Sequence, residues 1–96
     1  MTIDYKQIYI TLGKILVATE ARDISLFDKL DDKFSRLYKS AYADENLVTM
    51  GTTHNYHELD NIRQTCLIAL KFNKPEPECE QLVNSARKSF SELKKP

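Results

Sequence analysis

Apolar residues recur along the chain at intervals of three and four, the spacing that places side chains on one face of an α-helix. The clearest run consists of Phe27, Leu30, Phe34, Leu37 and Ala41. A continuous apolar stripe on a helix must be buried against another element. This run therefore predicts an amphipathic helix over residues 24–42 that packs into a core.

Three further segments, residues 4–21, 56–72 and 77–94, show the same periodicity. Their stripes contain, in chain order, Tyr5, Ile8, Leu12, Ile15 and Thr19, then Leu59, Ile62, Cys66 and Ala69 or Leu70, then Cys79, Leu82, Ala86, Phe90 and Leu93. The first two helices and the last two are joined by short segments, which favour antiparallel neighbours. The pattern predicts an all-α, four-helix, mainly antiparallel up-down bundle, formed by residues 1–96 as one domain.

Local signals indicate where these helices begin. Asp23 or Ser25 can cap the second helix, and Asn55 can cap the third with Glu58 in the reciprocal position. Gly13, in the middle of the first helix, indicates a place where another helix approaches closely. The apolar face of the fourth helix includes the small residues Cys79 and Ala86 and only a few larger ones. Because it buries less apolar surface, we expect this helix to detach most easily.

Composition and charge narrow the function. The hydrophobic fraction is 42%, and fourteen basic residues balance fourteen acidic ones. Because nucleic-acid binding depends on neutralising phosphates, we expect no nucleic-acid partner. The longest apolar run, residues 15–18, is far too short to cross a membrane, and the first residues lack the apolar run of a signal peptide. We therefore expect a cytoplasmic protein without membrane insertion, with Cys66 and Cys79 as buried reduced thiols.

The residue types that carry chemistry are few and scattered. His54 and His57 form a His-x-x-His pair, but zinc needs three or four protein ligands, so they are interpreted as surface histidines. Asp28, Asp31 and Asp32 alternate with basic residues, which is typical of a solvated charged face. We expect no catalysis, no metal and no cofactor.

Two groups of residues suggest contact with another molecule. The tyrosines are expected at one end of the bundle, where they form either a partner site or a water-facing end; they are Tyr5, Tyr9, Tyr38, Tyr42 and Tyr56. Other apolar residues lie off the narrow stripes: Ile10, Val17, Leu26, Ile68 and Phe72. These either widen the core or form part of a groove for an amphipathic helix.

The first two helices resemble a known family. An apolar helix is followed by a short acidic turn and by a second helix that starts with an aromatic residue and a leucine. The residues that carry this order are Tyr5, Ile15, Leu16, Ala18, Arg22, Asp23, Phe27 and Leu30. Over residues 5–42, and more loosely 56–72, the chain is similar to bacterial flagellar type III export chaperones of the FliT type. The resemblance implies a small cytoplasmic chaperone that binds a flagellar filament-cap subunit through a groove, which the last helix can cover.

The sequence therefore predicts a non-catalytic binding protein, a chaperone or adaptor with an apolar groove for a protein partner. The groove is expected to be lined by Leu26, Leu30, Phe34, Leu37, Tyr38, Tyr42, Leu59 and Ile62. Two alternatives stay open: an immunity or phage-type inhibitor protein that blocks a toxin or host enzyme, and a small homodimeric regulator that pairs the stripes of the second helix.

Overall fold

The computed structural model describes residues 5–43, 53–93 and 95, and within them the chain is helical, with no strand. The helices are α1 (Tyr5–Glu20), α2 (Ile24–Ala43), α4 (Thr53–Lys71) and α5 (Glu76–Glu92). Over the described residues, the prediction of an all-α fold with four helices is confirmed. The expected start of the first helix at residue 4 lies outside the described residues. None of the described helices is long and apolar enough to cross a membrane.

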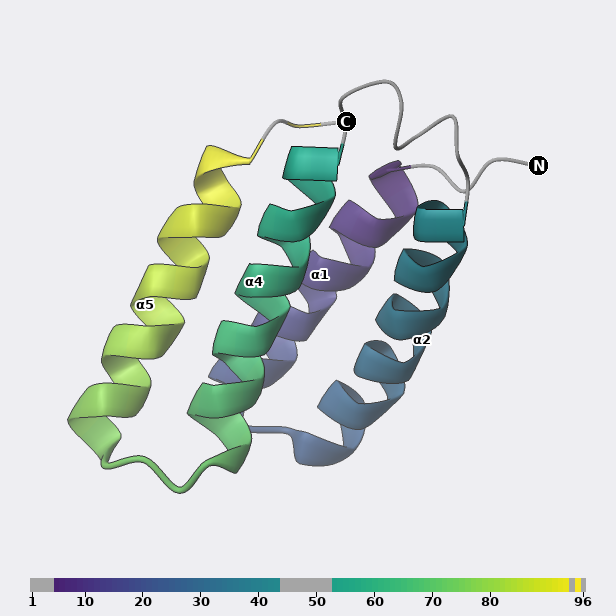
Figure 1. Ribbon diagram of the computed structural model, residues 1–96. Helices are drawn as coiled ribbons and strands as arrows, with labels where there is room; N and C mark the ends of the chain where they lie inside the picture. Colours follow the sequence, from purple (N-terminus) through teal and green to yellow (C-terminus); the bar gives the residue numbers. More distant parts are fainter. Residues whose placement is uncertain (1–4, 44–52, 94, 96) are drawn as a thin grey trace.

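The helices form two neighbouring pairs around a common core (Figure 1). α1 packs mainly against α2, and α4 packs mainly against α5. α1 also packs against α4 and α5, whereas α2 and α4 touch less extensively. α1 and α4 therefore form the centre of the molecule, with α2 and α5 on opposite flanks. The start of α1, the end of α2, the start of α4 and the end of α5 lie at the same end of the molecule.

The core is built from the predicted stripes. Its fully buried side chains include Ile8, Leu12 and Ile15 of α1, and Leu59 and Cys66 of α4. The buried face of α1 is wider than expected, because Thr11 and Ala18 are also enclosed. The buried Thr11 and Thr19 hydroxyls donate to the carbonyl oxygens four residues earlier, at 2.8 Å each, so their burial leaves no unpaired polar group.

Gly13 of α1 lies against the ring of Phe90 from α5. A Cβ atom at residue 13 would come within 3.3 Å of Phe90 Cζ, which is tighter than ordinary packing. Phe90 also stacks on Tyr9, with ring centroids 4.7 Å apart. The expected close approach at Gly13 is thus confirmed, and the approaching group is an aromatic ring rather than a backbone.

The geometry of the turn between α1 and α2 explains how only a few residues can join these two helices. Arg22 adopts a left-handed φ of 58°, and the N–H groups of Arg22 and Asp23 donate to Thr19 O (3.1 Å) and Ala18 O (3.0 Å). This is the Schellman pattern, which closes a helix with a residue in the left-handed region. Asp23 also caps α2, because its Oδ1 accepts from Leu26 N at 3.0 Å. Asp23, rather than Ser25, is therefore the cap.

The start of α4 differs from the sequence prediction. The helix begins at Thr53 rather than near residue 56, so Asn55 lies inside its first turn and the expected cap at Asn55 is wrong. Residues 54–56 include no Pro or Gly, so nothing in them prevents the helix from starting earlier.

The turn between α4 and α5 is held by a thiol. Asn73 adopts a left-handed φ of 51° after the end of α4, and Pro75 is the N-cap of α5. The Sγ of Cys79 donates to the carbonyl oxygens of Ala69 and Lys74, both at 3.3 Å. Cys79 therefore joins the end of one helix to the start of the next.

Candidate functional site

The structure divides the expected groove residues between the core and the surface. Phe34, Leu59 and Ile62 are buried, with exposed fractions of 1%, 0% and 4%. Leu30, Leu37 and Tyr38 are partly buried and pack against the core, whereas Leu26 is exposed; these residues do not lie on one open surface. The side chain of Tyr42 lies outside the described residues. A partner could reach the buried members only by displacing helices of the bundle.

An apolar groove is present on a different face, between α1 and α2. It has a volume of about 470 Å³ and is lined by Ile10, Gly13, Lys14, Val17, Leu26 and Leu30. Leu26 and Leu30 are thus the residues that the predicted and the observed grooves share. We call this surface the α1/α2 groove.

Large apolar side chains of the α1/α2 groove face solvent. Ile10 is 45% exposed, Val17 63% and Leu26 43%. Ile10 and Val17 are seven residues apart on α1, on the side opposite the core stripe of Ile8 and Ile15. Burying such side chains on binding would be favourable by roughly 25 cal/mol per Å² of apolar surface.

Of the other residues outside the narrow stripes, Phe72 is 59% exposed near the end of α4, and Ile68 is half-buried. The interpretation that these residues merely widen the core therefore fails for Ile10, Val17, Leu26 and Phe72. It holds in part for Ile68 alone.

The acidic cluster on α2 is not simply a solvated face, and that interpretation is wrong for Asp31. Asp31 Oδ1 accepts from Arg63 Nη1 of α4 at 3.0 Å, and Arg63 Nε also donates to Asp60 at 2.9 Å. Burial alone would lower the pKa of the Arg63 guanidinium, but the hydrogen bonds to Asp60 and Asp31 outweigh burial and raise it. The charge cluster thus fastens α2 to α4.

The other two carboxylates of that cluster are also paired. Asp28 binds Lys71 of α4, and the Lys71 ammonium lies 5.5 Å from the centroid of the Phe27 ring. Asp32 pairs with Arg36 at 2.7 Å within α2, as the sequence predicted. Asp28 and Asp31 thus join α2 to α4, whereas the pair of Asp32 lies within α2.

The described tyrosines pack in separate groups. The rings of Tyr5 and Tyr9 lie 6.1 Å apart, and Tyr9 stacks on Phe90. Tyr38 stacks on Phe34 at 5.7 Å. The side chains of Tyr42 and Tyr56 lie outside the described residues. The described rings are partly buried against the core, so they act first as packing groups.

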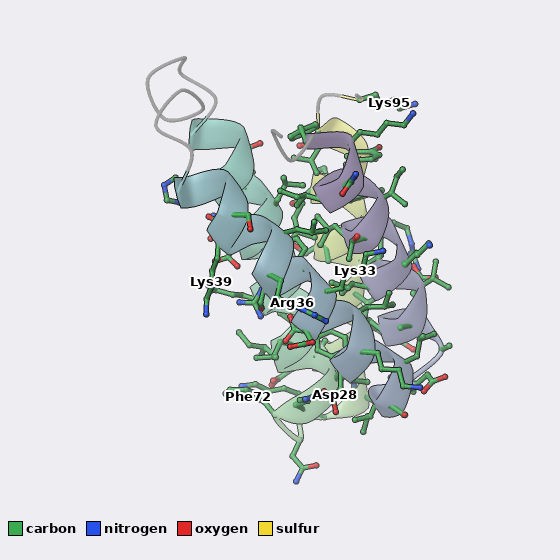
Figure 2. All side chains as sticks on the ribbon, turned by 90° about the vertical axis from the view of Figure 1, so that its right-hand side faces the viewer. Asp28, Lys33, Arg36, Lys39, Phe72 and Lys95 are labelled. Carbon is green, nitrogen blue, oxygen red and sulfur yellow. The ribbon has the colours of Figure 1, made fainter. Side chains whose placement is uncertain are left out.

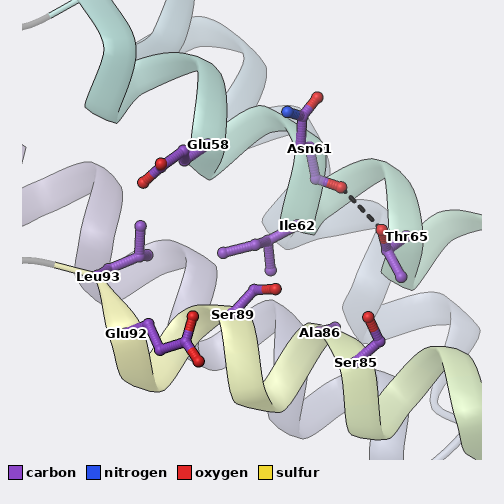
Figure 3. A pocket seen from close by; sticks show the side chains of 9 residues that line it. All are labelled: Glu58, Asn61, Ile62, Thr65, Ser85, Ala86, Ser89, Glu92 and Leu93. Carbon is purple, nitrogen blue, oxygen red and sulfur yellow. Dashed lines mark hydrogen bonds between the residues drawn. The ribbon is translucent and has the colours of Figure 1, made fainter.

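A second hollow lies between α4 and α5 (Figure 3). It has a volume of about 310 Å³ and is lined by Glu58, Asn61, Ile62, Thr65, Ser85, Ala86, Ser89, Glu92 and Leu93. The Thr65 hydroxyl is already engaged, because it donates to Asn61 O at 2.9 Å. Short side chains on α5 leave this space open, and its walls are mostly polar. It therefore offers less apolar contact than the α1/α2 groove.

The two cysteines are free thiols, as predicted, and both are buried. Burial raises the pKa of Cys66 to about 11, which keeps it protonated and unreactive at neutral pH. Within residues 5–43, 53–93 and 95, no group of three His, Cys, Asp or Glu side chains is placed to hold a metal ion. His57 is exposed, and the side chain of His54 lies outside the described part of the chain.

Comparison of this chain with protein families, with curated proteins and with solved structures found no match.

Proposed function

We propose that this protein is a non-catalytic helical binding protein, an adaptor or chaperone that holds a protein partner on the α1/α2 groove. The observation that carries the proposal is the exposure of Ile10, Val17 and Leu26 around one apolar hollow. Contiguous apolar surface on a small domain is a common mark of protein contact sites. The helices would form a mainly antiparallel up-down bundle in which α1, one of the central pair, forms one wall of the groove.

The chemistry of the described residues supports a role by contact. Nucleophilic catalysis needs a nucleophile beside a positioned base. Cys66 is enclosed in the core with a raised pKa, and Cys79 donates to carbonyl oxygens of the α4–α5 turn. Buried free thiols also suit a reducing compartment, so we place the protein in the cytoplasm.

A chaperone role in flagellar export is the more specific form of this proposal. It rests on the resemblance of residues 5–42 to that family, and its partner would be a secreted subunit. A homodimer that pairs the stripes of α2 is less favoured, because Phe27 and Phe34 are buried and would have to leave the core of each copy.

The test removes the apolar side chains of the groove and keeps the bundle. Full-length wild-type chain and the double variant Val17→Ser/Leu26→Ser are each cross-linked to partners in extracts of cells that express the protein naturally. Phe72→Ser is the matched control, because Phe72 is as exposed as Val17 but lies outside the groove. Since these side chains are exposed, we expect unfolding free energies within about 0.5 kcal/mol of wild type.

A partner captured by wild type and by Phe72→Ser, and lost from the double variant, is the expected result. Equal capture by all three chains would place the contact elsewhere and would remove the basis of the proposal. Turnover of a small molecule by the purified chain would contradict the non-catalytic assignment.

A further inference from the structure

The α1/α2 groove has an uneven charge environment. Lys14 lines the groove itself. Leu26, Leu30 and Lys33 follow each other at intervals of four and three on α2, so Lys33 continues the groove edge along the same face. Figure 2 shows Lys33 on the side of α2 toward α1, whereas Lys39 projects from the opposite side. Lys29, three residues after Leu26 on the same helix, is also exposed.

These lysines are unopposed. Lys14, Lys29 and Lys33 have no ion-pair partner among the residues that the structure describes. The carboxylates of the α1–α2 pair are already engaged: ion pairs hold Glu20, Asp28, Asp31 and Asp32, and a backbone N–H holds Asp23. A chain with zero formal net charge therefore presents a locally positive edge beside exposed apolar side chains.

We infer that the α1/α2 groove takes an amphipathic helix whose apolar stripe is flanked by acidic side chains. This inference rests on the proposed function and adds the chemistry of the partner. The apolar side chains from Ile10 to Val17 span about 10 Å of α1, or roughly two helical turns. A partner helix with apolar residues at i, i+3 or i+4, and i+7 matches that length. Its carboxylates would meet Lys14 in the lining of the groove and Lys33 at its edge.

A second copy of this chain fits the groove less well. In a symmetric dimer the same patch meets itself, so Lys14 and Lys33 of one copy would approach the same lysines of the other. Like charges that meet across an interface oppose association. An acidic partner turns the same lysines into favourable contacts.

The test is a selection with peptides of defined chemistry. A displayed library of amphipathic peptides of about 18 residues, roughly 27 Å as helices, keeps Leu, Ile or Val on one face. The flanking positions vary among Glu, Gln and Lys. The full-length chain is the bait, and Val17→Ser/Leu26→Ser is the counter-bait. Glu at the flanks is expected to be enriched about fivefold over Lys, the effect of two or three exposed ion pairs.

A charge reversal sharpens the result. Lys14→Glu/Lys33→Glu is expected to select Lys at the flanks, whereas the control Lys39→Glu keeps the preference for Glu. All these residues are exposed, so circular dichroism and thermal unfolding should match wild type. The preference should also weaken as the salt concentration rises, because salt screens exposed charges.

The outcomes separate the two proposals. Peptides that need Val17 and Leu26 but bind equally with Glu or Lys would overturn this inference and leave the proposed function standing. A library without any peptide that depends on Val17 and Leu26 would overturn both. Two further results would overturn the inference: stronger binding to phosphatidylserine vesicles than to any peptide, and dimerisation of the chain that the double variant abolishes.

Discussion

The two flanking helices, α2 and α5, attach to the same central pair in different ways. α2 inserts two phenylalanines into the core, Phe27 and Phe34, which are 0% and 1% exposed. The buried side chains within α5 are Cys79 and Ala86. A large aromatic side chain buries far more apolar surface than alanine or cysteine does. α2 is therefore held in the core by large buried aromatic side chains, whereas the buried side chains within α5 are small.

Contacts at the surface add to the attachment of α5. Arg22 binds Glu76, and Arg87 binds Glu20 at 2.6 Å, so ion pairs join α5 to α1 and to the α1–α2 turn. Phe90 adds a half-buried ring against Gly13 and Tyr9. Exposed ion pairs stabilise little each. From this difference we expect α5 to be the helix that is released most easily, which would leave the α1/α2 groove on the more stable half of the molecule.

The largest expected effect comes from removing a buried aromatic side chain of α2. Phe34→Ala should lower the unfolding free energy by about 3–5 kcal/mol, because it leaves a cavity in the core. It also removes the stack on Tyr38 and the contact with Arg63, whose guanidinium carbon lies 5.9 Å from the ring centroid. Urea unfolding measures the change. Cys79→Ala is the comparison on α5 and should cost about 1 kcal/mol; equal losses would refute the contrast between the two helices.

The second prediction concerns pH and the central helix α4. Burial raises the pKa of Cys66 to about 11, so the folded thiol keeps its proton where the unfolded thiol has lost it. Its contribution to stability is present below the unfolded pKa and is lost as the pH rises through about 11. The stability difference between wild type and Cys66→Ala should shrink by on the order of 2 kcal/mol between pH 8 and pH 11. A difference that stays constant with pH would mean that the thiol is not desolvated.

The third prediction measures how α5 rests on α1. Alanine favours a helix over glycine by about 1 kcal/mol, but a Cβ at residue 13 would press on Phe90. Gly13→Ala should therefore be nearly neutral alone and stabilising by about 1 kcal/mol in a Phe90→Ala background. A double-mutant cycle with thermal unfolding gives the coupling. The same effect in both backgrounds would show that the ring does not pack there in solution.

The smallest effect belongs to the surface ion pairs. Arg87→Met should cost less than about 1 kcal/mol, since Arg87 and Glu20 are both substantially exposed. It should still speed amide hydrogen exchange in α5, because the pair joins two helices. Arg36→Met is the matched control, since its partner Asp32 lies in the same helix. Faster exchange in α2 after Arg36→Met, with none in α5 after Arg87→Met, would reverse the comparison.

Part of the candidate site could be predicted from the sequence by first assigning the core residues of α1. Once the core stripe of α1 is assigned to Ile8, Leu12 and Ile15, helical geometry places Ile10 and Val17 on the opposite side. The same reasoning singled out Leu26. The periodicity placed Phe34 on the stripe and Leu26 outside it, but the predicted groove still grouped the two residues, because a wide apolar sector of α2 includes both.

Residue spacing alone predicted that this chain forms amphipathic helices and that one of them begins near Asp23 or Ser25, because those signals act within a few residues. Only the tertiary structure decided which apolar faces are covered. Periodicity fixes the direction of each side chain around its own axis, whereas burial depends on which neighbouring helix packs there. Phe34 is enclosed in the core, with Arg63 of α4 over its ring, whereas Val17 is 63% exposed; that difference leaves a core on one face and a groove on the other.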